Sequence, residues 1–249
     1  MRKSIFETKY TATNGQSTII PLNPNWKAVG VQLSGGLDSA LLLYLTTKTI
    51  KENNLDVKIL PFSIEVPSKA KNLSSARKII SVVSDLLDAE DIILPGKELF
   101  MPEEKSTHKR NKKNMYFNRE VKNLLRSGEV DFEFNGNTKN PPSKVRKKFI
   151  NNKVGRMRDR DARTSIYNGT YSASPHAMID KQGIISLYIK HDLIDILATH
   201  TLSCDANISD IIKFQMDIPC GKCWWCNERK WGFESNKISD PAPVLPKIW

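Results

Sequence analysis

The first third of the chain alternates short apolar runs with longer stretches whose apolar residues recur at helical spacing. Residues 27–33 form a short, β-branched run typical of a buried strand, and residues 40–51 that follow are good helix formers. A second apolar run followed by a helix-like stretch comes next along the chain, and a third apolar run follows it. The pattern predicts strands at 27–33, 57–66 and 91–94, with helices at 40–51 and 73–87.

This alternation predicts parallel βαβ units joined by right-handed crossovers. We therefore expect an α/β, doubly wound fold with a mostly parallel sheet. One edge strand is expected in the polar N-terminal extension, another strand at 130–134 and a helix at 181–199. The expected division is an extension (1–26), an α/β core (27–102), a basic insertion (103–165), the rest of the core with a zinc-binding segment (166–235) and a tail (236–249).

A glycine-containing turn separates the first predicted strand from the first predicted helix. Glycine lets the backbone approach an anion closely, and a helix N-terminus presents unpaired N–H groups and the positive end of its dipole. An aspartate suits such a site when Mg²⁺ lies between it and the phosphates. The alternative is an ordinary turn with a Ser or Asp N-cap, which the full string in its strand–helix context makes the weaker interpretation. The turn reads Ser34-Gly35-Gly36-Leu37-Asp38-Ser39.

That string resembles the SGGxDS signature of the N-type ATP pyrophosphatases, the PP-loop family. The resemblance implies a fold related to the adenine nucleotide alpha-hydrolases, in which ATP adenylates a carbonyl or carboxyl oxygen, with adenine near residues 63–65. No GxxxxGK[ST] string is present, which excludes a Walker-type NTPase. By resemblance the catalytic candidates are Asp38 and Ser39, and the ATP-binding residues are Leu33, Ser34, Gly35, Gly36, Leu37, Asp38 and Ser39.

All cysteines of the chain lie in its C-terminal quarter, at Cys204, Cys220, Cys223 and Cys226. Three of them have CxxCxxC spacing, and four thiolates suit a closed tetrahedral Zn²⁺ site. An iron–sulfur cluster and free thiols remain alternatives. His200 lies four residues before Cys204, but with four cysteines present we expect it beside the site rather than on the metal.

The surroundings of these cysteines resemble the C-terminal end of the 7-cyano-7-deazaguanine synthases. The resemblance rests on Thr201 to Cys204, on the CxxCxxC string and on Arg229, Gly232 and Phe233 after it. It implies a ligase that uses ATP and ammonia to convert 7-carboxy-7-deazaguanine to the amide or nitrile. In the middle of the chain the family's substrate segment is absent, and residues 135–138 stand in its place. The expected cofactors are thus ATP, Mg²⁺ and Zn²⁺.

The charge is concentrated in one segment. The chain has a net charge of +11, and the segment from Lys105 to Arg160 holds 17 basic and 5 acidic residues, a local net of +12. Clustered cations of this kind favour a nucleic-acid contact, and a solvated insertion is an equal alternative. This leaves two alternatives to the ligase: an ATP-dependent enzyme that modifies RNA or DNA directly, and a nucleotide-binding relic without turnover.

Hydropathy and the N-terminal sequence bear on where the protein is expected in the cell. No apolar run approaches the roughly 18 residues that span a bilayer, so we expect no membrane partner. The N-terminus has no apolar stretch of signal-peptide length, which predicts a cytoplasmic protein. Residue 2 is Arg, so the nucleophilic cysteine of a built-in glutaminase is absent there and ammonia is expected free or from a partner. The oligomeric state stays open, a homodimer included.

Overall fold

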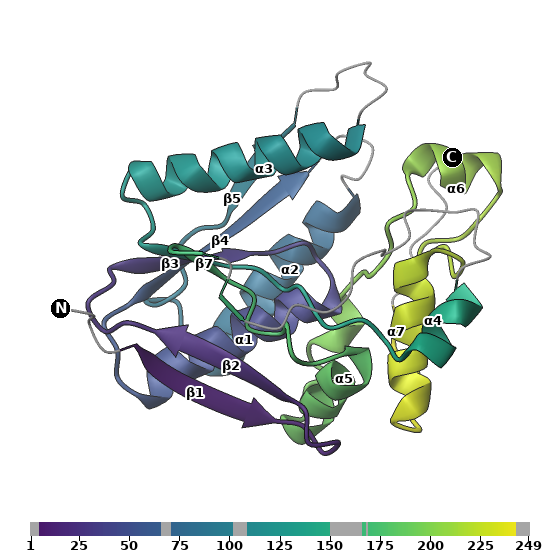
Figure 1. Cartoon of the computed structure of the whole chain (residues 1–249), viewed down its shortest axis with the longest axis horizontal. Coiled ribbons are helices and arrows are strands. Elements are labelled where there is room, and N and C mark those ends of the chain that lie inside the picture. Colours follow the sequence, from purple (N-terminus) through teal and green to yellow (C-terminus); the bar gives the residue numbers. More distant parts are fainter. Residues whose placement is uncertain (1–4, 66–70, 102–108, 150–165, 168, 243–249) are drawn as a thin grey trace.

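The computed structural model describes residues 5–65, 71–101, 109–149, 166–167 and 169–242. Its centre is a sheet of five parallel strands in the order β5-β4-β3-β6-β7 (Figure 1). The predicted α/β class with a parallel sheet is confirmed. The strands are β3 (Ala28–Gln32), β4 (Lys58–Glu65), β5 (Lys97–Phe100), β6 (Phe132–Phe134) and β7 (Ser172–Ala173).

The strand order changes direction beside β3. From β3 the chain continues to β4 and β5 on one side, whereas β6 and β7 lie on the other side. In open parallel sheets the loops at the carboxyl ends of the two strands diverge at such a point, and ligands bind in the crevice between them. The fold therefore marks the space above β3 and β6 as the first place to look for a site.

Helices cover both faces of the sheet. Helices α1 (Leu37–Glu52), α2 (Lys71–Leu87) and α5 (Lys181–Lys190) share the larger apolar core, into which β3 points Val29 and Val31. Helix α3 (Lys109–Arg126) covers the opposite face, where Leu60 and Phe62 of β4 belong to a second apolar cluster. Strands covered on both faces read as nearly continuous apolar runs, which explains their clear signal in the sequence.

The N-terminal extension forms a hairpin rather than the single edge strand expected. Strand β1 (Phe6–Thr11) pairs antiparallel with β2 (Ser17–Leu22) in a sheet of their own. Ile20 and Leu22 are fully buried in the larger core, so the hairpin packs against the α1 side of the molecule. Its turn is closed by Gly15, whose φ is +80°.

The strands predicted at 27–33 and 57–66 and the helices predicted at 40–51 and 73–87 are present as β3, β4, α1 and α2, whereas two other elements differ from the prediction. In the predicted strand at 91–94, Ile93 makes an isolated bridge to Ile59, and the paired strand β5 begins at Lys97. The helix predicted at 181–199 ends at Lys190, because Asp192 adopts a left-handed φ of +55° that a helix cannot continue through. The strand predicted at 130–134 is present as β6, paired with β3.

The C-terminal region packs beside the sheet (Figure 1). After the short helix η2 (Ala198–His200) come α6 (Ile208–Lys213) and α7 (Trp224–Ser235), and α7 packs against α5. Helix α4 (Ser143–Phe149) lies against α7, where Phe149 and Trp224 make an edge-to-face ring contact at 5.3 Å. No helix among the described residues is both long and apolar enough to cross a bilayer.

Candidate functional site

The predicted phosphate loop leaves the carboxyl end of β3 and enters α1. Its first residue is anchored to the neighbouring strand, because Leu33 N donates to Phe62 O at 2.8 Å and Ser63 Oγ donates to Leu33 O at 2.6 Å. At its other end Ser39 Oγ donates to Gly36 O, and Ser34 N donates to Ser39 Oγ at 3.1 Å. The loop is thus a closed turn held at both ends.

The geometry of the loop requires a glycine at position 35. Gly35 has a φ of +78°, and a Cβ added there would lie 2.4 Å from the carbonyl oxygen of Asn72 in α2. Gly36 is the N-cap of α1 and provides no side-chain cap. The Ser or Asp N-cap that the alternative interpretation assumes is not found here, because the N-cap residue of α1 is Gly36.

Asp38 already has a cation beside it. Lys181 Nζ donates to both carboxylate oxygens, at 2.5 and 2.6 Å. The side chain of Lys181 is 1% exposed and that of Asp38 is 22% exposed, so this is a largely buried ion pair at the edge of the loop. The charge that the sequence analysis assigned to Mg²⁺ is balanced here by a lysine from α5.

The ring of His176 links the same turn to the N-terminal hairpin. Its Nε2 lies 3.2 Å from the carbonyl oxygen of Asp38, and its Nδ1 lies 2.6 Å from Thr18 Oγ1 of β2. Complete burial lowers the pKa of His176 to about 4, against a partly offsetting attraction from Asp38, so the ring is neutral at physiological pH. The sequence analysis gave this residue no role.

The loop after β6 touches the start of α1. A Cβ added at Gly136 would lie 3.0 Å from Ser39 N, so a larger residue would push the two backbones apart. Residues 135–137 and the phosphate loop therefore meet at the switch point between β6 and β3. Asn135 is held there by Ser174, which donates to Asn135 Oδ1 at 2.6 Å.

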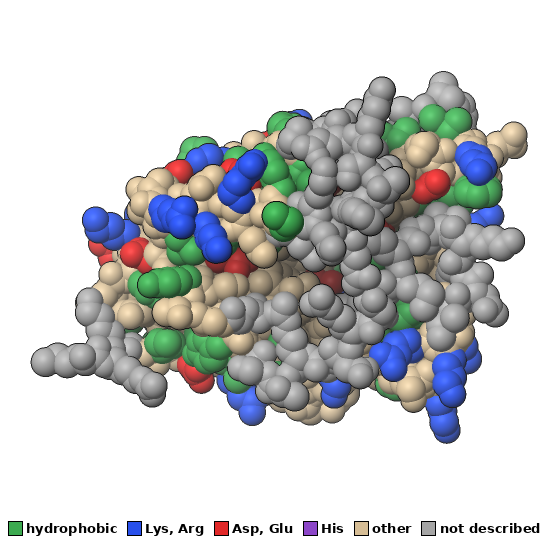
Figure 2. Space-filling model, turned by 45° about the horizontal axis from the view of Figure 1, so that its top comes forward, with side chains coloured by type: hydrophobic (Ala, Val, Ile, Leu, Met, Phe, Trp, Pro, Cys, Tyr) green, Lys and Arg blue, Asp and Glu red, His purple; other side chains and the backbone are tan. Residues whose placement is uncertain are grey.

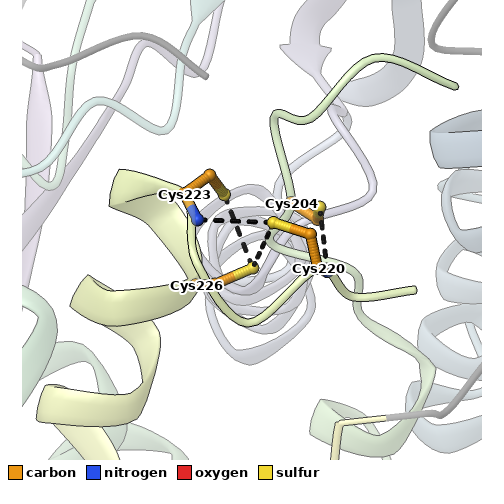
Figure 3. A group of neighbouring side chains, drawn as sticks. All are labelled: Cys204, Cys220, Cys223 and Cys226. Carbon is orange, nitrogen blue, oxygen red and sulfur yellow. Dashed lines mark hydrogen bonds between the residues drawn. The ribbon is translucent and has the colours of Figure 1, made fainter. Parts of the chain in front are cut away.

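The four cysteines come together at a second site (Figure 3). All four are buried, and their sulfur atoms lie within 4.8 Å of one another. Zn–S bonds of about 2.3 Å in a tetrahedron place the sulfurs about 3.8 Å apart. The Cys223–Cys226 and Cys220–Cys226 sulfur distances are 3.5 and 3.8 Å, so the set fits a single tetrahedral ion. A cubane cluster holds its thiolates on four separate irons and needs a wider set.

The local fold explains how the cysteines converge. Cys223 is the N-cap of α7 and Cys226 lies in its first turn, whereas Cys220 precedes the turn at Gly221, whose φ is +66°. Cys204 arrives from the segment after η2. Hydrogen bonds from the other three thiols, that of Cys220 first, lower the pKa of the Cys204 thiol. A bound cation would replace those protons.

No family model and no curated protein matches the chain. Among solved structures, it is similar to the U34-tRNA thiolase NcsA from Methanococcus maripaludis with its [4Fe-4S] cluster, at a TM-score of 0.44 and 14% identity over 67% of this chain. It is also similar to an NAD+ synthetase from Burkholderia pseudomallei, at a TM-score of 0.33 and 13% identity over 69% of this chain. The chain spans 57% and 59% of the lengths of those two proteins.

Proposed function

We propose that this protein is an ATP-dependent carbon–nitrogen ligase that activates the carboxylate of a 7-carboxy-7-deazaguanine-like substrate. A carboxylate oxygen attacks the α-phosphorus of ATP, and the bond to pyrophosphate breaks. Ammonia then adds to the acyl adenylate carbonyl, loses a proton, and AMP departs to leave the amide. Conversion of the amide to the nitrile removes the elements of water and requires a second activation by ATP.

The observation that carries the proposal is the position of the phosphate loop. The turn at residues 34–39 stands at the carboxyl end of β3, beside the switch point with β6, and opens onto the N-terminus of a 16-residue helix. Ser34 is exposed there, whereas the rest of the turn is largely enclosed. An anion at this place meets a helix dipole, backbone N–H groups and a hydroxyl.

Charge at the site supports the handling of pyrophosphate. Lys181 is a buried cation whose Nζ lies 2.5 and 2.6 Å from the two carboxylate oxygens of Asp38, so it places a positive charge beside the loop. Mg²⁺, held by the carboxylate of Asp38, would supply neutralisation of the triphosphate charge. Adenylation needs positioning and charge stabilisation rather than a side-chain nucleophile. The buried cysteines agree with this, because thiolates tied to Zn²⁺ carry no sulfur to a substrate.

Turnover with defined substrates tests the proposal. Zinc-loaded protein is incubated with Mg-ATP, ammonium and 7-carboxy-7-deazaguanine, and the products are followed by mass spectrometry and pyrophosphate release. The expected result is the amide or nitrile with AMP and pyrophosphate, lost in Asp38→Ala. Zinc-loaded, folded protein that leaves both ATP and the deazapurine unchanged would overturn the proposal.

One observation favours a second candidate, direct modification of a nucleic acid. Lys144, Lys147 and Lys148 of α4 are exposed on one short helix. The basic side chains on the face shown in Figure 2 nevertheless stand in several separate groups rather than one continuous patch. Salt-sensitive RNA binding that weakens on replacing these three lysines with alanine would support this candidate, and binding unaffected by the replacement would exclude α4 as the contact.

A further inference from the structure

The metal-binding segment also contacts the phosphate loop. Residues 201–204 run from η2 to the first cysteine and pass directly over Gly35 and Gly36. Leu202 N donates to Gly35 O at 2.7 Å, and Leu37 N donates to Ser203 Oγ at 3.3 Å. Residues 166 positions apart in the chain therefore share the first turn of α1.

Ser203 stands between the two sites. Its hydroxyl is at the N-terminus of α1, and its carbonyl oxygen accepts from Cys226 Sγ at 3.5 Å. The next residue is Cys204. Because Ser203 is bonded directly to Cys204, an ion that fixes Cys204 also restrains the backbone that carries the Ser203 hydroxyl.

The hydroxyl of Ser203 converges with that of Ser34. A Cβ built on Gly36 would lie 3.3 Å from Ser203 Oγ and 3.6 Å from Ser34 Oγ, so both oxygens face the same point beside the loop. Ser203 Oγ accepts from Leu37 N–H, and no bond donated by this hydroxyl is found among the described residues. Its proton can therefore be donated to a ligand oxygen, and a phosphate oxygen is the strongest acceptor at a helix N-terminus.

A separate set of contacts keeps the segment in place. Arg229 of α7 is 2% exposed, and its guanidinium donates to Thr201 O at 3.0 Å and to Thr201 Oγ1 at 2.7 Å. It also makes a two-oxygen contact with Asp240. The segment at residues 201–204 is thus bonded to α7 on one side and to the phosphate loop on the other, so a shift of the segment would disturb both sets of contacts.

We infer that Ser203 is a phosphate-binding residue supplied by the metal-binding segment, and that metal binding and nucleotide binding are therefore coupled. The inference rests on the proposed function for the existence of the nucleotide site. Coupling between two sites is reciprocal: the metal raises nucleotide affinity, and the nucleotide raises metal affinity by the same factor. A thiolate-held ion in this chain then acts on the ATP site as well as on stability.

Calorimetric titration with a non-hydrolysable ATP analogue and Mg²⁺ tests the assignment. Ser203→Ala is compared with wild type and with Ser209→Ala, which replaces an exposed serine of α6 six residues further along the chain. A hydrogen bond to a charged group contributes about 1.5–3 kcal/mol, so Ser203→Ala is expected to weaken binding roughly tenfold or more with unchanged zinc content. Ser209→Ala should bind like wild type. Equal affinities of wild type and Ser203→Ala would overturn the inference while leaving the proposed function intact.

A second measurement needs no variant. The wild-type protein is treated with a chromogenic chelator, and the rate and extent of metal removal are followed with and without the ATP analogue. Bound nucleotide is expected to retain the metal at higher chelator concentrations. Nucleotide that binds without shifting the chelator curve would refute the coupling. Wild type that binds no nucleotide at all would refute the proposed function and this inference together.

Discussion

Replacing Gly35 by alanine probes the fit between the phosphate loop and α2. The change has two separable costs. The first is the left-handed backbone, since Gly35 has a φ of +78° and a residue with a Cβ loses about 1–2 kcal/mol there. The second is a collision, because the new Cβ would lie 2.4 Å from Asn72 O and 3.2 Å from the Ser75 Cβ. Both belong to α2, so the clash cannot be relieved by a flexible side chain.

Gly15→Ala is the matched control. Gly15 has nearly the same φ, +80°, but nothing lies within 4 Å of the Cβ position, so it carries the backbone cost alone. Overpacking costs typically about 1–3 kcal/mol, and the middle of that range, about 2 kcal/mol, is the expected difference between the two variants. For a chain of this length each kcal/mol lowers the melting temperature by about 2–4 °C. Gly35→Ala should therefore melt about 4–8 °C below Gly15→Ala.

The assay is thermal unfolding followed by circular dichroism for both variants and the wild type, at one protein and metal concentration. Nucleotide affinity is measured alongside, because the loop must shift away from α2 to make room for the Cβ and its carbonyl anchors Leu202. Affinity should fall in Gly35→Ala and remain at the wild-type value in Gly15→Ala. Equal melting temperatures for the two variants would refute the close approach on which the loop geometry depends.

Three further predictions follow from the same contacts. The pKa of His176 falls from 6.5 to about 4 on folding, so the unfolded protein binds this proton at a higher pH than the folded protein does. The free energy of unfolding should therefore decrease by roughly 3 kcal/mol as the pH falls from 6.5 to about 4. His176→Gln should flatten this dependence in unfolding curves measured at several pH values. Lys181→Met should lower the free energy of unfolding by about 1–3 kcal/mol, less than for a fully buried pair because Asp38 is partly exposed. Adding Asp38→Asn should restore part of this loss. Strictly additive effects of the two changes in a double-mutant cycle would contradict the ion pair. Purified protein should contain zinc and show no iron–sulfur absorbance. Cys226→Ser should lower both the metal content and the melting temperature. Iron in place of zinc would show that the site holds a cluster.

The sequence predicted the parts of the site whose signal is local. A glycine turn between an apolar strand and a helix needs only neighbouring residues, and the CxxCxxC spacing brings three thiols together within one loop and one helical turn. The strand predicted at 91–94 failed for a related reason. Ile92 and Ile93 are buried in the core, but the pairing of this segment with β4 is limited to one bridge, between Ile93 and Ile59. An apolar run does not show how far such pairing extends.

The residues that the sequence left without a role come from distant parts of the chain. Lys181 lies 143 positions from Asp38, and His176 lies 138 positions from the carbonyl it faces. Nothing in the spacing of either residue indicates its partner, because the pairing depends on α5 crossing the start of α1. Lysine is almost never fully buried without a partner, so its 1% exposure marks the ion pair once the fold is known.

The start of α1 is held by four segments that share no local sequence signal. The β1–β2 hairpin reaches it through Thr18 and His176, the loop after β6 through Gly136, α5 through Lys181, and the metal-binding segment through Ser203. A reaction that proceeds by positioning and charge stabilisation requires donors that are already fixed before the substrate arrives. Because each of these contacts comes from a different element, no single loop movement displaces the helix terminus. The four contacts thus fix the phosphate loop in the way that the proposed adenylation would require, and that reaction needs no nucleophilic side chain.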